Sequence, residues 1–178
     1  LQTLMRPLAV RVPLLNPSVL LDTLLPLARP LFGRLGLLAW LVLLSIALLT
    51  GLEHADGMAE HAEKRFLDPV NLLSLWVLYP LVKGLHEIGH GLAIRRWGGK
   101  VGEMGVMLLV FVPVPYVDAA AATVFKDKWQ RVVTGAAGIM VELTLAAVAM
   151  LFWSSVQSGM VSDLAFNIMV IGGVSTLL

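Results

Sequence analysis

The sequence of 178 residues contains no cysteine, and only 14% of its residues are charged. The absence of cysteine excludes disulfide bonds and cysteine-ligated metal sites within this chain. The low charge accompanies 58% hydrophobic residues, a composition that is far from that of a soluble domain and predicts several membrane spans. The net charge is +1 and no basic run is present, so we expect a lipid bilayer and no nucleic acid as a partner.

Long apolar stretches divide the chain into candidate spans. The second stretch contains Pro80, which we expect to bend it, and the third opens with small residues that favour close helix packing. We therefore predict an all-α polytopic membrane protein with about four transmembrane helices. These should lie at about residues 35–52, 70–94, 132–153 and 161–178, which together form a membrane-embedded core at 35–178. Because the chain starts at Leu1 and ends within the last span, we expect it to be a piece of a longer protein, truncated at the C-terminus.

The second span ends in the pattern His-Glu-Ile-Gly-His, at residues 86–90. Side chains at positions i and i+4 of a helix lie on the same face, so His86 and His90 could hold one zinc ion, with Glu87 beside them as a general base. The alternative is two core histidines and a surface glutamate. It is disfavoured because ionisable groups in apolar spans are costly and usually functional. A histidine-box oxygenase needs many more than the four histidines of this chain.

The segments that precede and follow the first span both carry charged residues. Residues 1–34 form a basic N-terminal arm, with four arginines against the single acid Asp22. The apolar positions of residues 19–27 predict a helix on the membrane surface, and a poorly ordered arm is the equal alternative. Residues 53–68 contain five acids and are predicted to form a polar loop in which His54 and His61 are solvated.

The segment after the motif, residues 100–131, is not an ordinary loop. Its apolar part, residues 107–112, is too short to cross a bilayer as a helix and is followed by Pro-Val-Pro-Tyr-Val-Asp at 113–118. We predict a short β-hairpin or re-entrant segment that packs against the motif helix, where a strand edge could receive an extended substrate. A connector that dips into the membrane interface is equally compatible with the sequence.

Four more ionisable residues bear on the predicted site. Lys83 is one turn before Glu87 and could either tune this carboxylate or extend toward the interface. Glu142 lies inside the third span, where an acid should face the helix bundle, and a structural role is favoured. Glu103 and Asp118 flank the apolar segment and are expected to be solvated.

Basic residues predict the orientation in the membrane. Four arginines precede the first span, six lysines or arginines lie in residues 95–131, and none follows Arg131. By the positive-inside rule, the N-terminus and the 95–131 segment are cytoplasmic. The motif then lies at the cytoplasmic end of the second span.

Together, these motifs resemble those of the site-2 protease family of intramembrane zinc metalloproteases, and most closely its bacterial branch of peptide zinc metalloproteases. The resemblance covers nearly the whole chain. Its motifs are His-Glu-Ile-Gly-His-Gly at 86–91, Trp-Gly-Gly at 97–99, Glu-Met-Gly at 103–105, residues 113–118, Ala-Ala-Gly at 136–138, Val-Glu-Leu at 141–143 and residues 173–178.

The resemblance implies a Zn²⁺-dependent endopeptidase of the bacterial cytoplasmic (inner) membrane that cleaves membrane-embedded or membrane-associated peptides, with partner or adaptor subunits in some relatives. It also implies a third metal ligand, an aspartate of an Asn-Pro…Asp-Gly motif later in the chain, and no such motif follows His90 in this sequence. We expect this aspartate after Leu178, with Asp118 as a less favoured substitute. The alternative function is a non-proteolytic membrane scaffold or export-complex subunit that keeps the protease-like fold.

Overall fold

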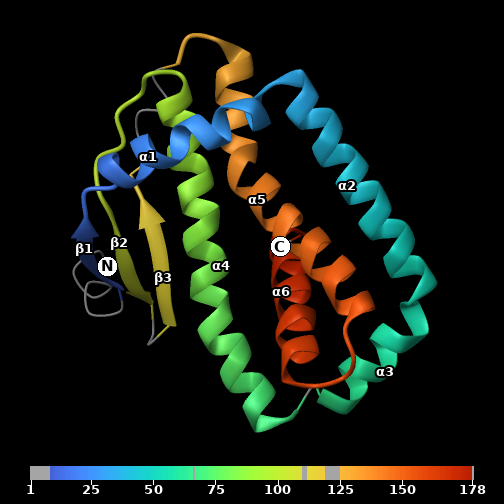
Figure 1. Cartoon of the computed structure of the whole chain (residues 1–178). Helices are drawn as coiled ribbons and strands as arrows, with labels where there is room; N and C mark the ends of the chain where they lie inside the picture. Colours follow the sequence, from blue (N-terminus) through green and yellow to red (C-terminus); the bar gives the residue numbers. More distant parts are fainter. Residues whose placement is uncertain (1–8, 66, 110–111, 119–124, 178) are drawn as a thin grey trace. The chain divides into compact units, whose positions relative to one another are not determined.

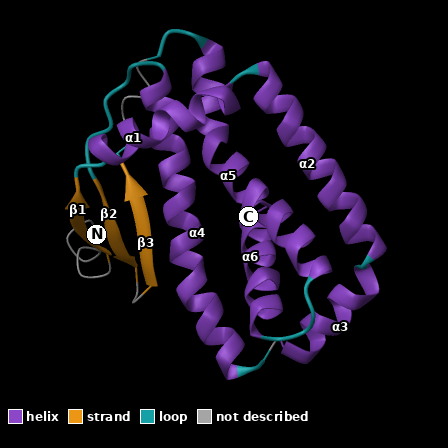
Figure 2. Cartoon of the chain, in the orientation of Figure 1, coloured by secondary structure: helices purple, strands orange, loops and turns teal. Residues whose placement is uncertain are grey.

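The computed structural model describes residues 9–65, 67–109, 112–118 and 125–177 of the chain. The described chain is mostly helical, with one small sheet (Figures 1 and 2). In chain order the elements are β1 (Ala9–Leu15), α1 (Ser18–Ala28), the 3-10 helix η2 (Arg29–Phe32), α2 (Arg34–Glu53), α3 (Ala55–Arg65), α4 (Pro69–Arg96), β2 (Met104–Leu109), β3 (Val112–Val117), α5 (Lys128–Ser155) and α6 (Met160–Leu177).

The chain forms two compact units. The first, here called the motif unit, comprises Leu1–Gly33 and Lys83–Met140. The second, the bundle unit, comprises Arg34–Val82 and Val141–Leu178. Helix α4 therefore begins in the bundle unit and ends in the motif unit. Helix α5 begins in the motif unit and ends in the bundle unit. All three strands belong to the motif unit.

The sheet of the motif unit is antiparallel, in the order β1-β2-β3. Strands β2 and β3 form the predicted hairpin, and β1 adds an edge strand that we did not predict. Both edge strands contain proline, Pro13 in β1 and Pro113 and Pro115 in β3. Proline has no backbone N–H, so in a sheet its nitrogen faces away from the neighbouring strand. Each outer edge thus lacks hydrogen-bond donors at its proline positions, so a further strand could pair there only through the carbonyl groups of the prolines.

Helix α1 packs on the C-terminal half of α4 in the motif unit. Leu21 is only 1% exposed and lies against Gly91, where a Cβ atom would be 3.0 Å from Leu21 Cδ1. Asp22 beside it accepts a hydrogen bond from Arg95 Nε at 2.9 Å. Leu21, Ile94 and Val101 form the buried core at this place. The predicted helix at residues 19–27 is therefore present, and it is held by both apolar packing and an ion pair.

The bundle unit has a core between α2, α5 and α6, formed by Ala47, Ala147, Ala149, Met150, Phe166 and Met169. Helices are present at all four positions where we predicted spans. Of the helices in the described residues, α2 and α5 are long and apolar enough to cross a membrane, while α6 carries a shorter apolar stretch, Met160–Val174. Four spans are therefore not established. Helix α4 is less apolar because the polar residues of the motif lie in its second half.

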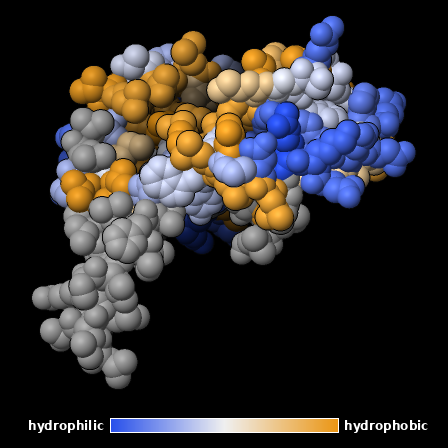
Figure 3. Space-filling view, turned by 90° about the horizontal axis from the view of Figure 1, so that it is seen from below, coloured by the Kyte–Doolittle hydropathy of each residue, from blue (hydrophilic) through white to orange (hydrophobic). Residues whose placement is uncertain are grey.

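The outer face of α2 is almost entirely apolar and exposed. Its exposed large residues are Leu35, Leu37, Leu38, Leu41, Val42, Ile46, Leu48, Leu49 and Leu52. In the view of Figure 3, hydrophobic residues likewise cover much of the visible face, and hydrophilic residues gather in one area. Such a helix is stable in lipid, where apolar side chains need no burial in protein.

The prediction of a loop at residues 53–68 is wrong, because residues 55–65 form helix α3. The prediction that His61 is solvated is also wrong. Its side chain is 15% exposed, and its ring lies 4.5 Å from the ring of Phe166 and 5.8 Å from that of Trp153, centroid to centroid. His54 is exposed, but its ring also meets Trp153 edge-on. The high polarity of this segment reflects a helix with one packed face, not a loop.

Candidate metal centre

The two motif histidines face each other on one side of α4. Their Nε2 atoms are 3.0 Å apart, and their ring centroids are 4.7 Å apart. Two nitrogens that bind one tetrahedral zinc ion at 2.0–2.1 Å are roughly 3.4 Å apart. The histidine pair therefore needs an opening of only a few tenths of an ångström to accept a zinc ion between the two Nε2 atoms.

A backbone carbonyl fixes the orientation of His90. Its Nδ1 atom is 2.7 Å from the carbonyl oxygen of Thr134 on α5. Because a carbonyl can only accept, Nδ1 carries the proton and Nε2 keeps its lone pair, which points toward His86. A hydrogen bond to the far nitrogen of the ring is the usual way in which proteins orient a histidine ligand for a metal.

The absence of a side chain at Gly138 makes room for His86. A Cβ atom at position 138 would lie 2.5 Å from both Cδ2 and Cε1 of the His86 ring. No real Cβ contact is that short, so any larger residue has to displace the imidazole. Helix α5 thus supports both histidines, one through the Thr134 carbonyl and the other through the close approach of Gly138.

Substitution Gly138→Ala should weaken zinc binding by about 10- to 100-fold, the range typical of disturbed support for a metal ligand. The matched control is Gly135→Ala, one turn earlier on α5, where a Cβ atom meets nothing within 4 Å. Both changes add the same methyl group to a helix, so differences in helix propensity cancel. The zinc affinity of each variant can be measured by competition with a chelator. Equal affinities in the two variants would contradict the steric role of Gly138.

The other residues that the sequence singled out differ in how exposed their side chains are. Glu87 follows His86 directly and is partly exposed, as is Lys83. Glu103 and Asp118 are exposed as predicted, and the Asp118 backbone N–H donates to the Glu103 carbonyl at 2.8 Å. In the part of the chain that the structure describes, no group of three His, Asp or Glu side chains could hold a metal. The structure therefore does not bring Asp118 to the histidine pair.

The sequence model of peptidase family M50 matches residues 74–177, more than half of the chain. The chain belongs to peptidase family M50. This is the site-2 protease family, so the resemblance found in the sequence is confirmed. The searches of curated proteins and of solved structures gave no match.

The M50 match begins at Ser74 on α4 and ends in α6, so it contains the motif, the hairpin and Gly138. Strand β1 and helices α1 to α3 precede it. Membership makes this chain part of a metallopeptidase family of membrane proteins. The individual roles of His86, Glu87 and His90 remain predictions from the motif.

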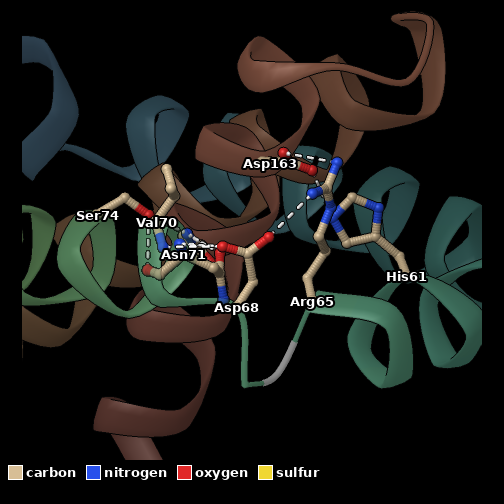
Figure 4. A network of polar contacts seen from close by, with 8 residues as sticks. His61, Arg65, Asp68, Val70, Asn71, Ser74 and Asp163 are labelled. Atoms are coloured by element: carbon tan, nitrogen blue, oxygen red, sulfur yellow. Dashed lines mark hydrogen bonds and ion pairs between the residues drawn. The ribbon is translucent and has the colours of Figure 1, made fainter.

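A polar network in the bundle unit was not predicted (Figure 4). Arg65 on α3 pairs with Asp68 at 3.2 Å and with Asp163 on α6 at 3.3 Å. Asp68 also caps α4, because its Oδ1 atom accepts from the backbone N–H of Val70 at 2.8 Å. This bond, more than the nearby Arg65, holds the pKa of Asp68 below its usual value. His61 Nε2 is 3.2 Å from Asp163 Oδ1, close enough for an ion pair but not aligned as a hydrogen bond.

The network continues along α4 through Asn167 of α6, which is 2% exposed. Its Nδ2 atom donates to Asn71 Oδ1 and to Ser74 Oγ, each at 2.7 Å. In an apolar bundle such bonds hold helices together because the alternative is an unsatisfied amide. Glu142 in α5 is fully buried in the same unit, as expected for an acid inside an apolar helix. The bonds of Asn167 with Asn71 and Ser74 thus join α6 to α4 within the bundle unit.

Proposed function

We propose that this chain is the core of an intramembrane zinc metalloprotease that cleaves membrane-embedded or membrane-associated peptides. The observation that carries the proposal is the pair of Nε2 atoms of His86 and His90, 3.0 Å apart, in a chain of peptidase family M50. These two histidines would hold the zinc ion. A third ligand would come from outside the described residues, and an aspartate is the residue that the family resemblance implies.

The chemistry divides between the metal and Glu87. When bound, zinc supplies a Lewis acid that polarises a peptide carbonyl and makes water nucleophilic near neutral pH. A carboxylate oxygen of Glu87 takes a proton from the attacking water and later gives it to the leaving amine. The Thr134 carbonyl accepts a hydrogen bond from Nδ1 of His90, which orients the ring so that Nε2 is the nitrogen directed at the metal position.

The hairpin beside α4 offers one edge to an extended substrate. A Cβ atom at Gly84 would lie 4.0 Å from Pro115 Cγ, so β3 runs close to the motif helix. The outer edge of β3 presents carbonyl groups at Pro113 and Pro115 but no N–H at either position. A substrate strand that pairs there must therefore donate its own N–H groups. We propose that substrates with proline facing these positions are cleaved more slowly, because proline has no N–H to donate.

We also propose four membrane spans, at α2, α4, α5 and α6, with the N-terminus in the cytoplasm of a bacterium. Support comes from the apolar composition of α2, α5 and α6 and from the basic residues at 1–34 and 95–131. Arg95, Arg96 and Trp97 at the end of α4 are typical of a membrane interface. Water would then reach the histidines from the cytoplasmic side.

The test is cleavage of a membrane-embedded reporter peptide by the purified full-length protein in lipid. We expect activity to fall to background when zinc is removed with a chelator and to return when zinc alone is added back, because the metal binds reversibly. A magnesium addition serves as the control. Absence of cleavage at full zinc occupancy would contradict the proposal and favour the scaffold.

A further inference from the structure

Helix α1 has two faces with different surroundings. Leu21 and Ala28 are buried, at 1% and 8% exposure, whereas Val19 and Leu27 are 78% and 77% exposed. Val19, Thr23 and Leu27 are four residues apart and lie along one line of the helix. Leu20 and, in η2, Leu31 are also exposed, at 42% and 61%. One side of α1 thus packs on α4, and the other presents large apolar side chains.

The exposed face of α1 carries no free charge. Asp22 is the only charged residue between Ser18 and Ala28, and it is paired with Arg95 at the flank of the helix. The hydroxyl of Thr23 donates to the Val19 carbonyl at 2.8 Å, so its polar group is satisfied within the helix. Such a face can be transferred out of water without leaving a polar group unsatisfied.

Chain connectivity brings this face near a membrane. Only Gly33 separates η2 from Arg34, the first residue of α2, and the most apolar part of α2 is just 6% buried in protein. If α2 is a membrane span, as proposed above, its first residue lies near the level at which the chain enters the bilayer. Leu27 is seven residues earlier and, even in a fully extended chain, lies at most about 25 Å from Arg34.

Basic and aromatic residues surround the same region of the motif unit. Arg29 and Arg96 are exposed, and the rings of Phe32 and Trp97 pack against each other with centroids 6.1 Å apart. Arginine next to an exposed apolar face favours a surface of anionic headgroups over a neutral protein partner. Aromatic side chains are likewise enriched at the level of the headgroups.

From these observations we propose that α1 is a membrane-surface helix. Its face with Val19, Leu20, Leu27 and Leu31 lies in the interface of the bilayer, and its opposite face holds α4 through Leu21 and Asp22. The partner is a bilayer with anionic phospholipid. The proposal rests on the proposed membrane span α2 but needs neither zinc nor proteolysis, so its failure can be distinguished from failure of the proposed protease.

The test uses the absence of cysteine from this sequence. Variants Val19→Cys and Leu27→Cys of the full-length protein, made in a background without other cysteines, are labelled with an environment-sensitive fluorophore. They are placed in nanodiscs of phosphatidylcholine and phosphatidylglycerol. Leu48→Cys on the exposed face of α2 is the reference for lipid, and Glu63→Cys on α3 is the reference for water. The readouts are quenching by iodide and by lipids that carry a nitroxide near the headgroup.

We expect labels at positions 19 and 27 to be quenched by the nitroxide lipid and to be several-fold less sensitive to iodide than the label at position 63. Sensitivity to iodide equal to that at position 63, without quenching by lipid, would overturn the proposal. Protection from both quenchers would also overturn it, because the face would then be covered by protein.

Discussion

Substitution Glu87→Gln should lower the rate of peptide cleavage by about 10²- to 10⁴-fold, the usual contribution of a general acid–base. Glutamine has nearly the same shape but cannot take a proton from water. It leaves His86 and His90 in place, so zinc content should be unchanged. Single-turnover cleavage of the reporter peptide and zinc per chain should be measured on the same sample.

The control for Glu87→Gln is Glu103→Gln, which makes the same chemical change at an exposed residue between α4 and β2. We expect this variant to cleave at the wild-type rate. If purified Glu87→Gln protein retains most of its activity, then Glu87 is not the base and the mechanism has to be rejected. Loss of zinc from the same variant would instead point to a ligand role.

Substitution His86→Ala should reduce zinc from near one ion per chain to almost none and abolish cleavage as a result. It removes one of the two nitrogens that the structure places 3.0 Å apart, and His90 with a single further ligand would hold the ion far more weakly. Elemental analysis of the detergent-purified full-length protein measures the effect directly. Folding can be followed in parallel by the helical circular dichroism signal, which should not change.

His54→Ala is the matched control, because it removes an exposed imidazole at the turn between α2 and α3. Zinc content should then equal that of the wild type. Full zinc occupancy in His86→Ala would show that the ion binds elsewhere and would contradict the proposed site. No zinc in any form under metal-replete conditions would contradict the site as well and favour the scaffold.

Much of the site region could be predicted from sequence because its signals are local. The spacing of His86 and His90 depends only on the pitch of a helix, and the Nε2 atoms do lie together. The hairpin of β2 and β3 follows from an apolar run too short for a span. These features need no knowledge of what packs against them.

The parts that could not be predicted depend on tertiary packing. Strand β1 contains Pro13, which argues against a strand, and it forms because β2 offers an edge for pairing. The sequence of helix α3 is as polar as that of a loop. The helix is packed because His61 contacts Phe166 and Trp153, which lie far from it in the sequence. The support of the histidines by Thr134 and Gly138 spans more than 40 residues. No pattern in the sequence near the motif predicts this support.

The close fit of Leu21 against Gly91 changes how the motif itself should be understood. Gly91 directly follows His90, yet its contact is with Leu21 of the N-terminal helix α1. The last residue of His-Glu-Ile-Gly-His-Gly therefore serves helix packing, whereas the proposed metal and proton roles of the motif rest on His86, Glu87 and His90. In other chains with this motif, a bulky residue at this place would indicate that the N-terminal helix is absent or sits differently, even where the metal ligands are intact.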